Sequence, residues 1–376
     1  MNRIYLDHNA TSPAPKAVVD AVAHAMTVVG NASAQHGHGR AAASLVADAR
    51  EAVGMAMGQC AQDVLFTGSG TEAINTAIHS AVSAGCKHLL VSSLDHPASI
   101  MAAEASGARV TLLPATSSGQ TDMHALAAIL ANWDADDGRP FLSRVAANSE
   151  TGVIQDTDRA IDLIGEAGGL VLIDAVQALG KLPMNYPADY VAVSAHKIGG
   201  PQGVGALYVS PDAPYTSLLH GGGQERRRRA GTLNTAGIAG FGAAASDVGA
   251  RFTGLRELRD ALQDALIAID PHTIVFGTRE ARLPNTLFIT APGLRAMTAM
   301  MNFDLAGISV STGTACSSGK VGESRALRAM GRIKDVSAPD YFEGAIRISF
   351  GPDNTNDDVQ AVAKVWATLR KARKAA

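Results

Sequence analysis

Short apolar runs alternate with longer amphipathic segments through the first two-thirds of the chain. Strands are expected near 64–67, 88–93, 109–113, 142–147, 170–174, 190–194 and 205–209, with helical patterns between most of them. Strands that alternate with helices predict a mainly parallel sheet covered by helices. The expected fold class is therefore α/β, with a seven-stranded sheet in the larger of two domains.

The pattern changes in the last third of the chain. A helical pattern runs from Phe241 to about Ala268, and the segments after it are shorter. They comprise strands near 285–290, 308–311 and 345–349, helices between them and a final helix over 357–373. Before the large sheet, the sequence predicts a strand over 3–7, a helix near Lys16, a polar loop over 31–40 and a helix over 41–57. We expect a large domain over 16–250 and a smaller α/β domain formed by 1–15 and 251–376.

Composition narrows the class of protein. The chain has 376 residues, 47% hydrophobic and 18% charged, as in an ordinary globular enzyme large enough for two domains. A net charge of −3 gives no reason to expect nucleic acid or an anionic membrane as partner. The N-terminus lacks a secretory signal, no apolar run reaches the length of a membrane span, and the three cysteines have no paired spacing. These features predict a cytoplasmic protein.

Polar residues follow two of the buried strands. Asp174 ends the strand at 170–174, and Ser194, His196 and Lys197 follow the strand at 190–194. A lysine just past a buried strand is costly to desolvate unless it has a use. A pyridoxal phosphate enzyme needs such a set: a lysine for the Schiff base, an aspartate for the pyridinium nitrogen and hydroxyls for the phosphate. The alternative is a chance occurrence of polar residues at two strand ends.

A glycine turn after the strand at 64–67 has two interpretations. Gly68-Ser-Gly70-Thr71-Glu-Ala73 matches G-x-G-x-x-A, and Asp95 stands where a dinucleotide site would need its ribose-binding acid. Alternatively, the amides of Gly70 and Thr71 bind a single phosphate at a helix N-terminus. We favour the single phosphate, because that interpretation also uses the aspartate and lysine described above.

Further polar residues end neighbouring strands. His96 could stack on a cofactor ring and shuttle protons, although a lone histidine is more often structural. Asn148 and Gln177 could donate to a ring oxygen. Arg347 interrupts an apolar strand and could bind a carboxylate through two hydrogen bonds, or lie at the sheet edge with its charge in water.

Cys316 is the most informative cysteine. It lies in a run of glycine, serine and threonine, where a thiol is exposed and reactive, whereas Cys60 and Cys86 are expected to fill space.

His36 and His38 have no third ligand spaced near them, so no metal site is predicted. The four arginines at 226–229 predict a solvated loop or a subunit contact rather than nucleic-acid binding.

Taken together, these motifs resemble those of the cysteine desulfurases (NifS- and IscS-like), a branch of the class V aminotransferases with the type I pyridoxal phosphate transferase fold. The resemblance extends from Tyr5-Leu-Asp-His to the strand around Arg347. Its specific motifs are Gly70-Thr71-Glu72, Asp95-His96, Asn148-Ser-Glu-Thr-Gly152, Asp174-Ala-Val-Gln177, Ser194-Ala-His-Lys197, Gly221-Gly-Gly-Gln-Glu225, Gly231-Thr-Leu233 and Ala315-Cys-Ser-Ser.

The resemblance implies a role for each of these side chains. Lys197 would form the Schiff base, Asp174 would pair with the ring nitrogen, Gln177 would contact the ring hydroxyl, and His96 would stack on the ring and serve in catalysis. Gly70, Thr71, Ser194 and His196 would surround the phosphate, and Thr232 would reach it from a second subunit. Asn148 and Arg347 would bind the substrate carboxylate, and Cys316 would take the sulfur as a persulfide.

The resemblance also implies a partner set. L-cysteine would be the substrate, the protein would be a homodimer, and sulfur would pass to an acceptor protein such as an iron–sulfur scaffold. A selenocysteine lyase or another class V enzyme of the aminotransferase type is the alternative, and a catalytically inactive regulator with the same fold is a third. The sequence departs from the family at Ser149, usually asparagine, and at Glu323-Ser-Arg325, usually Pro-Ser-His.

Overall fold

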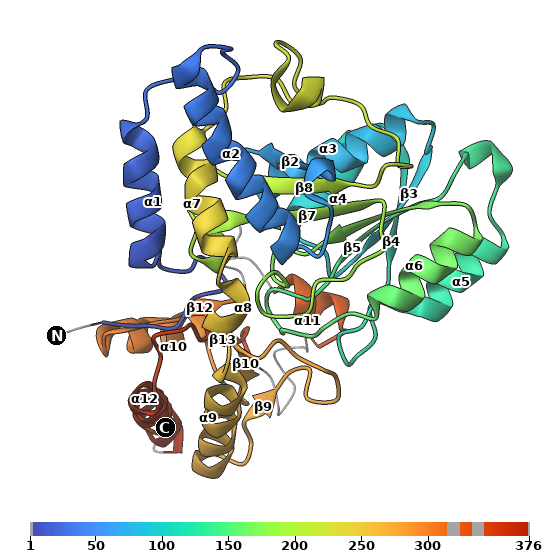
Figure 1. Cartoon of the computed structure of the whole chain (residues 1–376). Helices are drawn as coiled ribbons and strands as arrows, with labels where there is room; N and C mark the ends of the chain where they lie inside the picture. The colour runs from blue at the N-terminus through green and yellow to red at the C-terminus, as the bar shows by residue number, and fades with distance from the viewer. Residues whose placement is uncertain (1–2, 314–323, 333–341, 375–376) are drawn as a thin grey trace.

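A computed structural model describes residues 3–313, 324–332 and 342–374 (Figure 1). Its main feature is a seven-stranded sheet in the order β2-β8-β7-β6-β5-β3-β4. The strands are β2 (Val64–Thr67), β3 (His88–Ser92), β4 (Arg109–Leu113), β5 (Phe141–Val145), β6 (Leu170–Asp174), β7 (Tyr190–Ser194) and β8 (Gly205–Val209). β8 runs antiparallel to β2 and β7, and the other neighbouring pairs are parallel. The mainly parallel α/β sheet predicted from the sequence is confirmed.

Both faces of this sheet are buried, which explains why its strands are apolar without alternation. Leu170 and Leu172 of β6 pack on one face together with α3 (Gly70–Ser83) and α4 (Pro97–Ala105). Val171 and Ile173 pack on the opposite face. The helices on that face are α1 (Lys16–Thr27), α2 (Gly37–Ala56), α5 (Met123–Ala131), α6 (Thr157–Glu166) and α7 (Thr235–Ala245).

A smaller layer lies below the large sheet in Figure 1. It contains the antiparallel sheet β12-β13-β10-β9 and the parallel pair β1-β11. Its strands are β1 (Ile4–Tyr5), β9 (Ile274–Val275), β10 (Thr286–Thr290), β11 (Ile308–Ser309), β12 (Ser311–Thr312) and β13 (Ile346–Ser349). Its helices are α9 (Leu255–Ile269), α10 (Ala296–Leu305), α11 (Arg325–Ala329) and α12 (Asn356–Lys374). The N-terminal strand therefore pairs with the C-terminal third, while the predicted boundaries at 15/16 and 250/251 stay a prediction.

Two local predictions were wrong. The helix expected from Phe241 to Ala268 is three helices, α7, α8 (Val248–Arg251) and α9, and Gly254 before α9 has φ +80°. Such a left-handed residue ends a helix, and glycine adopts it without strain. Helix α2 begins at Gly37 rather than near 41, because Nδ1 of His36 accepts a hydrogen bond from the Gly39 amide and caps it.

Candidate active site

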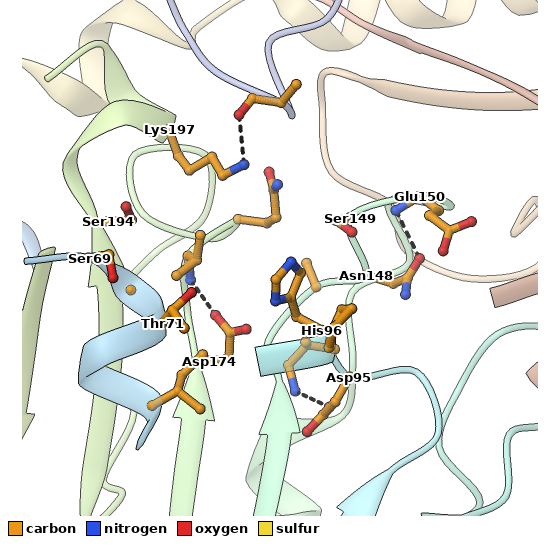
Figure 2. Close-up of a pocket in the computed structure, with 18 of the residues that line it drawn as sticks. Ser69, Thr71, Asp95, His96, Asn148, Ser149, Glu150, Asp174, Ser194 and Lys197 are labelled. Atoms are coloured by element: carbon orange, nitrogen blue, oxygen red, sulfur yellow. Dashed lines mark hydrogen bonds between the residues drawn. The ribbon is translucent and has the colours of Figure 1, made fainter. Parts of the chain in front are cut away.

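A cavity of 780 Å³ lies at the carboxyl ends of the parallel strands. β6 ends there in Asp174 and β7 in Ser194, and helices α3 and α4 begin beside it. The predicted site residues that line it are Gly70, Thr71, His96, Asn148, Asp174, Gln177, Ser194, His196, Lys197 and Arg347. Figure 2 shows how residues from different strand ends converge on this space. Thr232 is exposed and does not line the cavity, and Cys316 lies outside the described residues.

The N-terminus of α3 forms one wall. Ser69 caps the helix by accepting from the Glu72 amide at 3.1 Å, and the Glu72 carboxylate accepts from the Gly68 amide at 2.7 Å. A Cβ on Gly70 would lie 2.9 Å from Val176 Cγ2 and 3.3 Å from Ser194 Cβ, so glycine lets this turn sit against β7. A helix start of this kind favours an anion.

His196 supplies a second polar group at the same wall. Its Nδ1 is buried and has no hydrogen-bond partner among residues 3–313, 324–332 and 342–374. Burial and the charge of Lys197 lower the pKa of His196 to about 4, so the imidazole is neutral at neutral pH. A buried polar atom without a protein partner suits a ligand that carries hydrogen-bonding groups.

Asp174 and Lys197 face the cavity from adjacent strand ends. One carboxylate oxygen of Asp174 accepts from the Val176 amide at 3.0 Å, and burial raises the pKa of this carboxyl to about 6. Lys197 Nζ donates to the backbone oxygens of Asn9 and Ala10, each at 2.8 Å. The lysine is therefore held by the N-terminal segment, and the aspartate can pair with a cationic group in the cavity.

His96 caps α4 and faces the same space (Figure 2). Its Nδ1 accepts a hydrogen bond from the Ala98 amide at 3.1 Å, so a neutral ring carries its hydrogen on Nε2. Burial, followed by the charges of Lys197 and Arg325, lowers the pKa of His96 to about 4. A neutral imidazole thus offers the cavity one hydrogen-bond donor and an apolar ring face.

The two predicted carboxylate-binding residues already have protein partners. Asn148 Oδ1 accepts from the amides of Glu150 and Thr151, and its Nδ2 donates to Leu94 O at 3.1 Å. Arg347 is 1% exposed and pairs with Asp7 at 2.8 Å, while its Nε has no partner among the described residues. Their role toward a substrate stays a prediction.

Asp95 does not suit the dinucleotide interpretation. Its carboxylate is buried beneath the cavity and accepts from the Val145 amide at 2.8 Å and from Ser143 Oγ at 2.9 Å. Burial raises its pKa well above the ordinary value. The residue therefore joins β5 to the start of α4, which positions His96, and leaves no carboxylate for a ribose.

Three residues that the sequence analysis did not single out also belong to this region: Asn9, Glu150 and Lys181. Asn9 and Lys181 are buried around Gln177 and Lys197. Glu150 lines the cavity and accepts from Ser324 Oγ and, at 3.4 Å, from the Ala326 amide. Ser324 is the N-cap of α11, so Glu150 connects α11 to the strand-end loop after β5.

Glu150 should stabilise the folded protein as a buried hydrogen-bond acceptor, a role that a glutamine side chain can also fill. Alanine would leave the Ser324 hydroxyl and the Ala326 amide without their buried acceptor, so we expect the free energy of unfolding to fall by about 1–3 kcal/mol. Urea unfolding of Glu150→Ala and Glu150→Gln measures the difference, and an equal loss in both variants would contradict this role.

The same residue predicts a pH dependence. Burial raises the pKa of Glu150 to about 7, above its unfolded value, so the folded state binds the proton more tightly. Its contribution to stability therefore falls as the pH rises from about 4.3 to about 7. Glu150→Gln should remove that part of the pH dependence.

Among the residues that the structure describes, no group of histidine, cysteine, aspartate or glutamate is arranged to hold a metal ion. In the same ranges, no helix is both long and apolar enough to cross a membrane.

Comparisons with known proteins identify the family and the fold of this chain. The model of the aminotransferase class-V family matches residues 4–362. Cysteine desulfurases of Gluconacetobacter diazotrophicus and Cereibacter sphaeroides are each 36% identical to the chain. Each alignment covers 97% of this chain; the first covers 92% of the Gluconacetobacter protein and the second covers 95% of the Cereibacter protein. The solved NifS-like protein from Rickettsia africae is 29% identical, with a TM-score of 0.87 over 98% of this chain and 100% of that one.

Proposed function

The chain belongs to the aminotransferase class-V family, and on that basis we propose that the protein is a pyridoxal phosphate-dependent cysteine desulfurase, which converts L-cysteine to L-alanine. The observation that carries the proposal is the convergence of Lys197, Asp174 and His96 on one cavity at the carboxyl edge of the sheet. Release of alanine from L-cysteine by the purified protein tests it.

The residues around the cavity fit pyridoxal phosphate. The start of α3 at Gly70 and Thr71, together with Ser194 and the unpartnered Nδ1 of His196, would hold the phosphate. Asp174 would pair with the ring nitrogen, Gln177 would contact the ring oxygen, His96 would lie against the ring, and Lys197 would bind the aldehyde carbon. When bound, the cofactor supplies an electron sink for the charge that develops at the substrate Cα.

The protein's own residues then provide the proton transfers. The Asp174 carboxylate would keep the proton on the ring nitrogen, because a buried carboxylate beside a cation favours the charged pair. Lys197 Nζ would remove the proton from the substrate Cα. Asn148 and Arg347 would orient the substrate carboxylate.

Sulfur transfer would use Cys316, which lies outside the described residues. Its thiolate attacks the substrate sulfur, the Cβ–S bond breaks, and Cβ receives a proton. One cysteine and one enzyme thiol thus give one alanine and one enzyme persulfide, with no external oxidant or reductant. An acceptor protein, such as an iron–sulfur scaffold, would then take the sulfur in the cytoplasm; following radiolabelled sulfur from the persulfide tests this step.

Replacing His96 with alanine should remove most turnover but only part of the cofactor. Ring contact is one of several contacts to the cofactor, whereas proton transfer by a positioned side chain contributes about 10²–10⁴-fold to the rate. Alanine production and bound cofactor should be measured for His96→Ala beside His124→Ala, a change at an exposed histidine outside the cavity. Unchanged turnover in the first variant would exclude His96 from the mechanism.

Thr232 supports a homodimer. It is exposed in its own chain and follows a strained loop in which Glu225, Arg226 and Arg227 have φ of 46°, 56° and 67°. The loop is held by the buried Glu225 carboxylate, which binds Arg50 at 2.6 Å. Backbone strain of this kind is typical of functional sites, and here it would position Thr232 to contact the phosphate in a second subunit.

We therefore expect sedimentation at the mass of a dimer. Thr232→Ala should bind pyridoxal phosphate more weakly but unphosphorylated pyridoxal as before, because only the phosphate contact is lost. A fully active monomer would rule out this arrangement.

A further inference from the structure

A second lysine lies buried beside the first. Lys181 follows β6 by a short turn and is 8% exposed. Its Nζ donates to Gln177 Oε1 at 3.0 Å and to Asn9 Oδ1 at 3.2 Å, and lies 5.8 Å from the centre of the Phe252 ring. Within the described part of the chain, no carboxylate forms an ion pair with it. A buried amine without a carboxylate is costly to keep charged, so its position calls for an explanation.

Asn9 connects the two lysines. Its backbone oxygen accepts from Lys197 Nζ at 2.8 Å, and its side-chain Oδ1 accepts from Lys181 Nζ. Asn9 is itself 1% exposed, so little water screens the two amines from each other. A positive charge on either amine therefore disfavours a positive charge on the other.

Lys181 also determines how Gln177 is oriented. An ammonium group only donates, so the atom of Gln177 that it meets is the oxygen, Oε1. The amide nitrogen Nε2 then donates one hydrogen to Asn9 O at 2.9 Å and has a second hydrogen left. This orientation makes Gln177 a donor toward an oxygen in the cavity.

We propose that Lys181 is a positioning residue for Lys197 and Gln177: its positive charge keeps the Lys197 amine unprotonated near neutral pH, and its hydrogen bond fixes the amide of Gln177. The inference rests on the proposed role of Lys197 as the lysine that binds the cofactor. It explains how a lysine can act as nucleophile and base at a pH where an isolated lysine is protonated.

The electrostatics of the site couple the charges of the two amines. Burial, and then the charges of Lys197 and Arg347, lower the pKa of Lys181 to about 7. Because Lys197 is one of these causes, Lys181 holds its proton more firmly whenever Lys197 has none. Among the described residues, the other titratable or charged groups around the pair include Asp174 of β6, His8 near the N-terminus, His96 of α4, His196, Arg251 of α8, Glu150 and Arg325 in the cavity lining, and Arg347 of β13 with its partner Asp7.

The test follows the reactivity of Lys197 rather than turnover. Full-length protein stripped of cofactor is mixed with pyridoxal phosphate, and the rate of linkage is measured from pH 6 to pH 10 in about one-unit steps, a range that spans the ordinary lysine pKa. Only an unprotonated amine reacts. We expect Lys181→Met and Lys181→Gln to shift the rate profile to higher pH by about one unit, which slows the reaction about ten-fold near pH 7, while rates near pH 10 stay equal.

Two further variants separate charge from structure. Lys181→Arg keeps a positive charge and should react near pH 7 almost as the wild type does, and Lys16→Met, at an exposed lysine of α1, should change nothing. The proposal would be overturned if the linkage rates of Lys181→Met and Lys181→Gln followed the same pH profile as the wild type. It would also be overturned if Lys181→Arg reacted near pH 7 as slowly as Lys181→Met and Lys181→Gln. A linkage that still forms in Lys197→Ala would instead refute the assignment of Lys197, and so the proposed function.

The unaltered protein gives a second measurement if the Lys181 variants do not fold. Lysine 13Cε NMR of the stripped wild type should show two coupled titration steps, with the Lys197 signal changing at the lower pH. A lower step that belongs to Lys181, with Lys197 still protonated near neutral pH, would overturn the proposal. Ordinary titration of both lysines near pH about 10.4 would overturn the proposal.

Discussion

Replacing Lys197 with alanine should abolish both the covalent attachment of pyridoxal phosphate and the production of alanine from cysteine. The amine is the nucleophile for the cofactor and the base at the substrate Cα, and no other group at the strand end after β7 can replace both roles. Because a covalent step is lost together with a proton transfer, we expect turnover to fall by more than about 10⁴-fold. Borohydride reduction of the wild type, followed by peptide mapping, should label Lys197.

Lys181 makes this experiment discriminating. Lys181 and Lys197 both donate hydrogen bonds to Asn9. If any lysine near the cavity could react with the cofactor, the borohydride label could therefore fall on either residue. The proposed function requires the label on Lys197 alone in the wild type, and no stable label in Lys197→Ala. Label on Lys181 in the wild type would refute the assignment.

The second large effect is expected at Cys316. Serine in its place should leave the fold and the visible absorbance of the bound cofactor intact, because the residue is far in sequence from the strands that carry Lys197 and Asp174. A hydroxyl is a much poorer nucleophile toward sulfur than a thiolate, so persulfide formation and alanine release from cysteine should collapse.

Cys60 and Cys86 provide matched controls. Cys60 is exposed and Cys86 is buried, where burial raises the pKa of its thiol to about 11 and keeps it inert. Serine at Cys60 and alanine at Cys86 should preserve turnover. Full desulfuration by Cys316→Ser, or a persulfide on Cys60, would overturn the role of Cys316.

Turnover of selenocysteine tests the alternative that the protein is a selenocysteine lyase. Such an enzyme would keep its turnover of selenocysteine in Cys316→Ser.

Local signals were sufficient to predict the large sheet and the residues that end its strands at the cavity. Runs such as Leu170–Asp174 are apolar because both faces of the sheet are covered, and they end in polar residues because ligands bind at the carboxyl ends of parallel strands. All seven strands were expected within one or two residues of their observed bounds. The residues at those ends therefore came together as predicted.

The rest depends on contacts between distant parts of the chain. Asn9 contacts Lys197, Gln177 and Lys181 in a structure where the preceding strand β1 pairs with the distant β11, and no local pattern encodes that pairing. The bond between Glu150 and Ser324 likewise spans 174 positions. The single helix predicted from Phe241 was wrong because the sequence keeps a helical pattern of apolar residues through Gly254. An isolated glycine within such a pattern is compatible with a continuous helix, so it did not indicate the break that the structure has there.

The products formed from L-cysteine test the central claim most directly. The purified protein with bound pyridoxal phosphate should be incubated with L-cysteine, the small products quantified, and the protein mapped by mass spectrometry. The account predicts one alanine for each sulfur transferred and a persulfide on the peptide that contains Cys316. Pyruvate with ammonia, a keto acid that retains the sulfur, or alanine formed without any enzyme persulfide would contradict it.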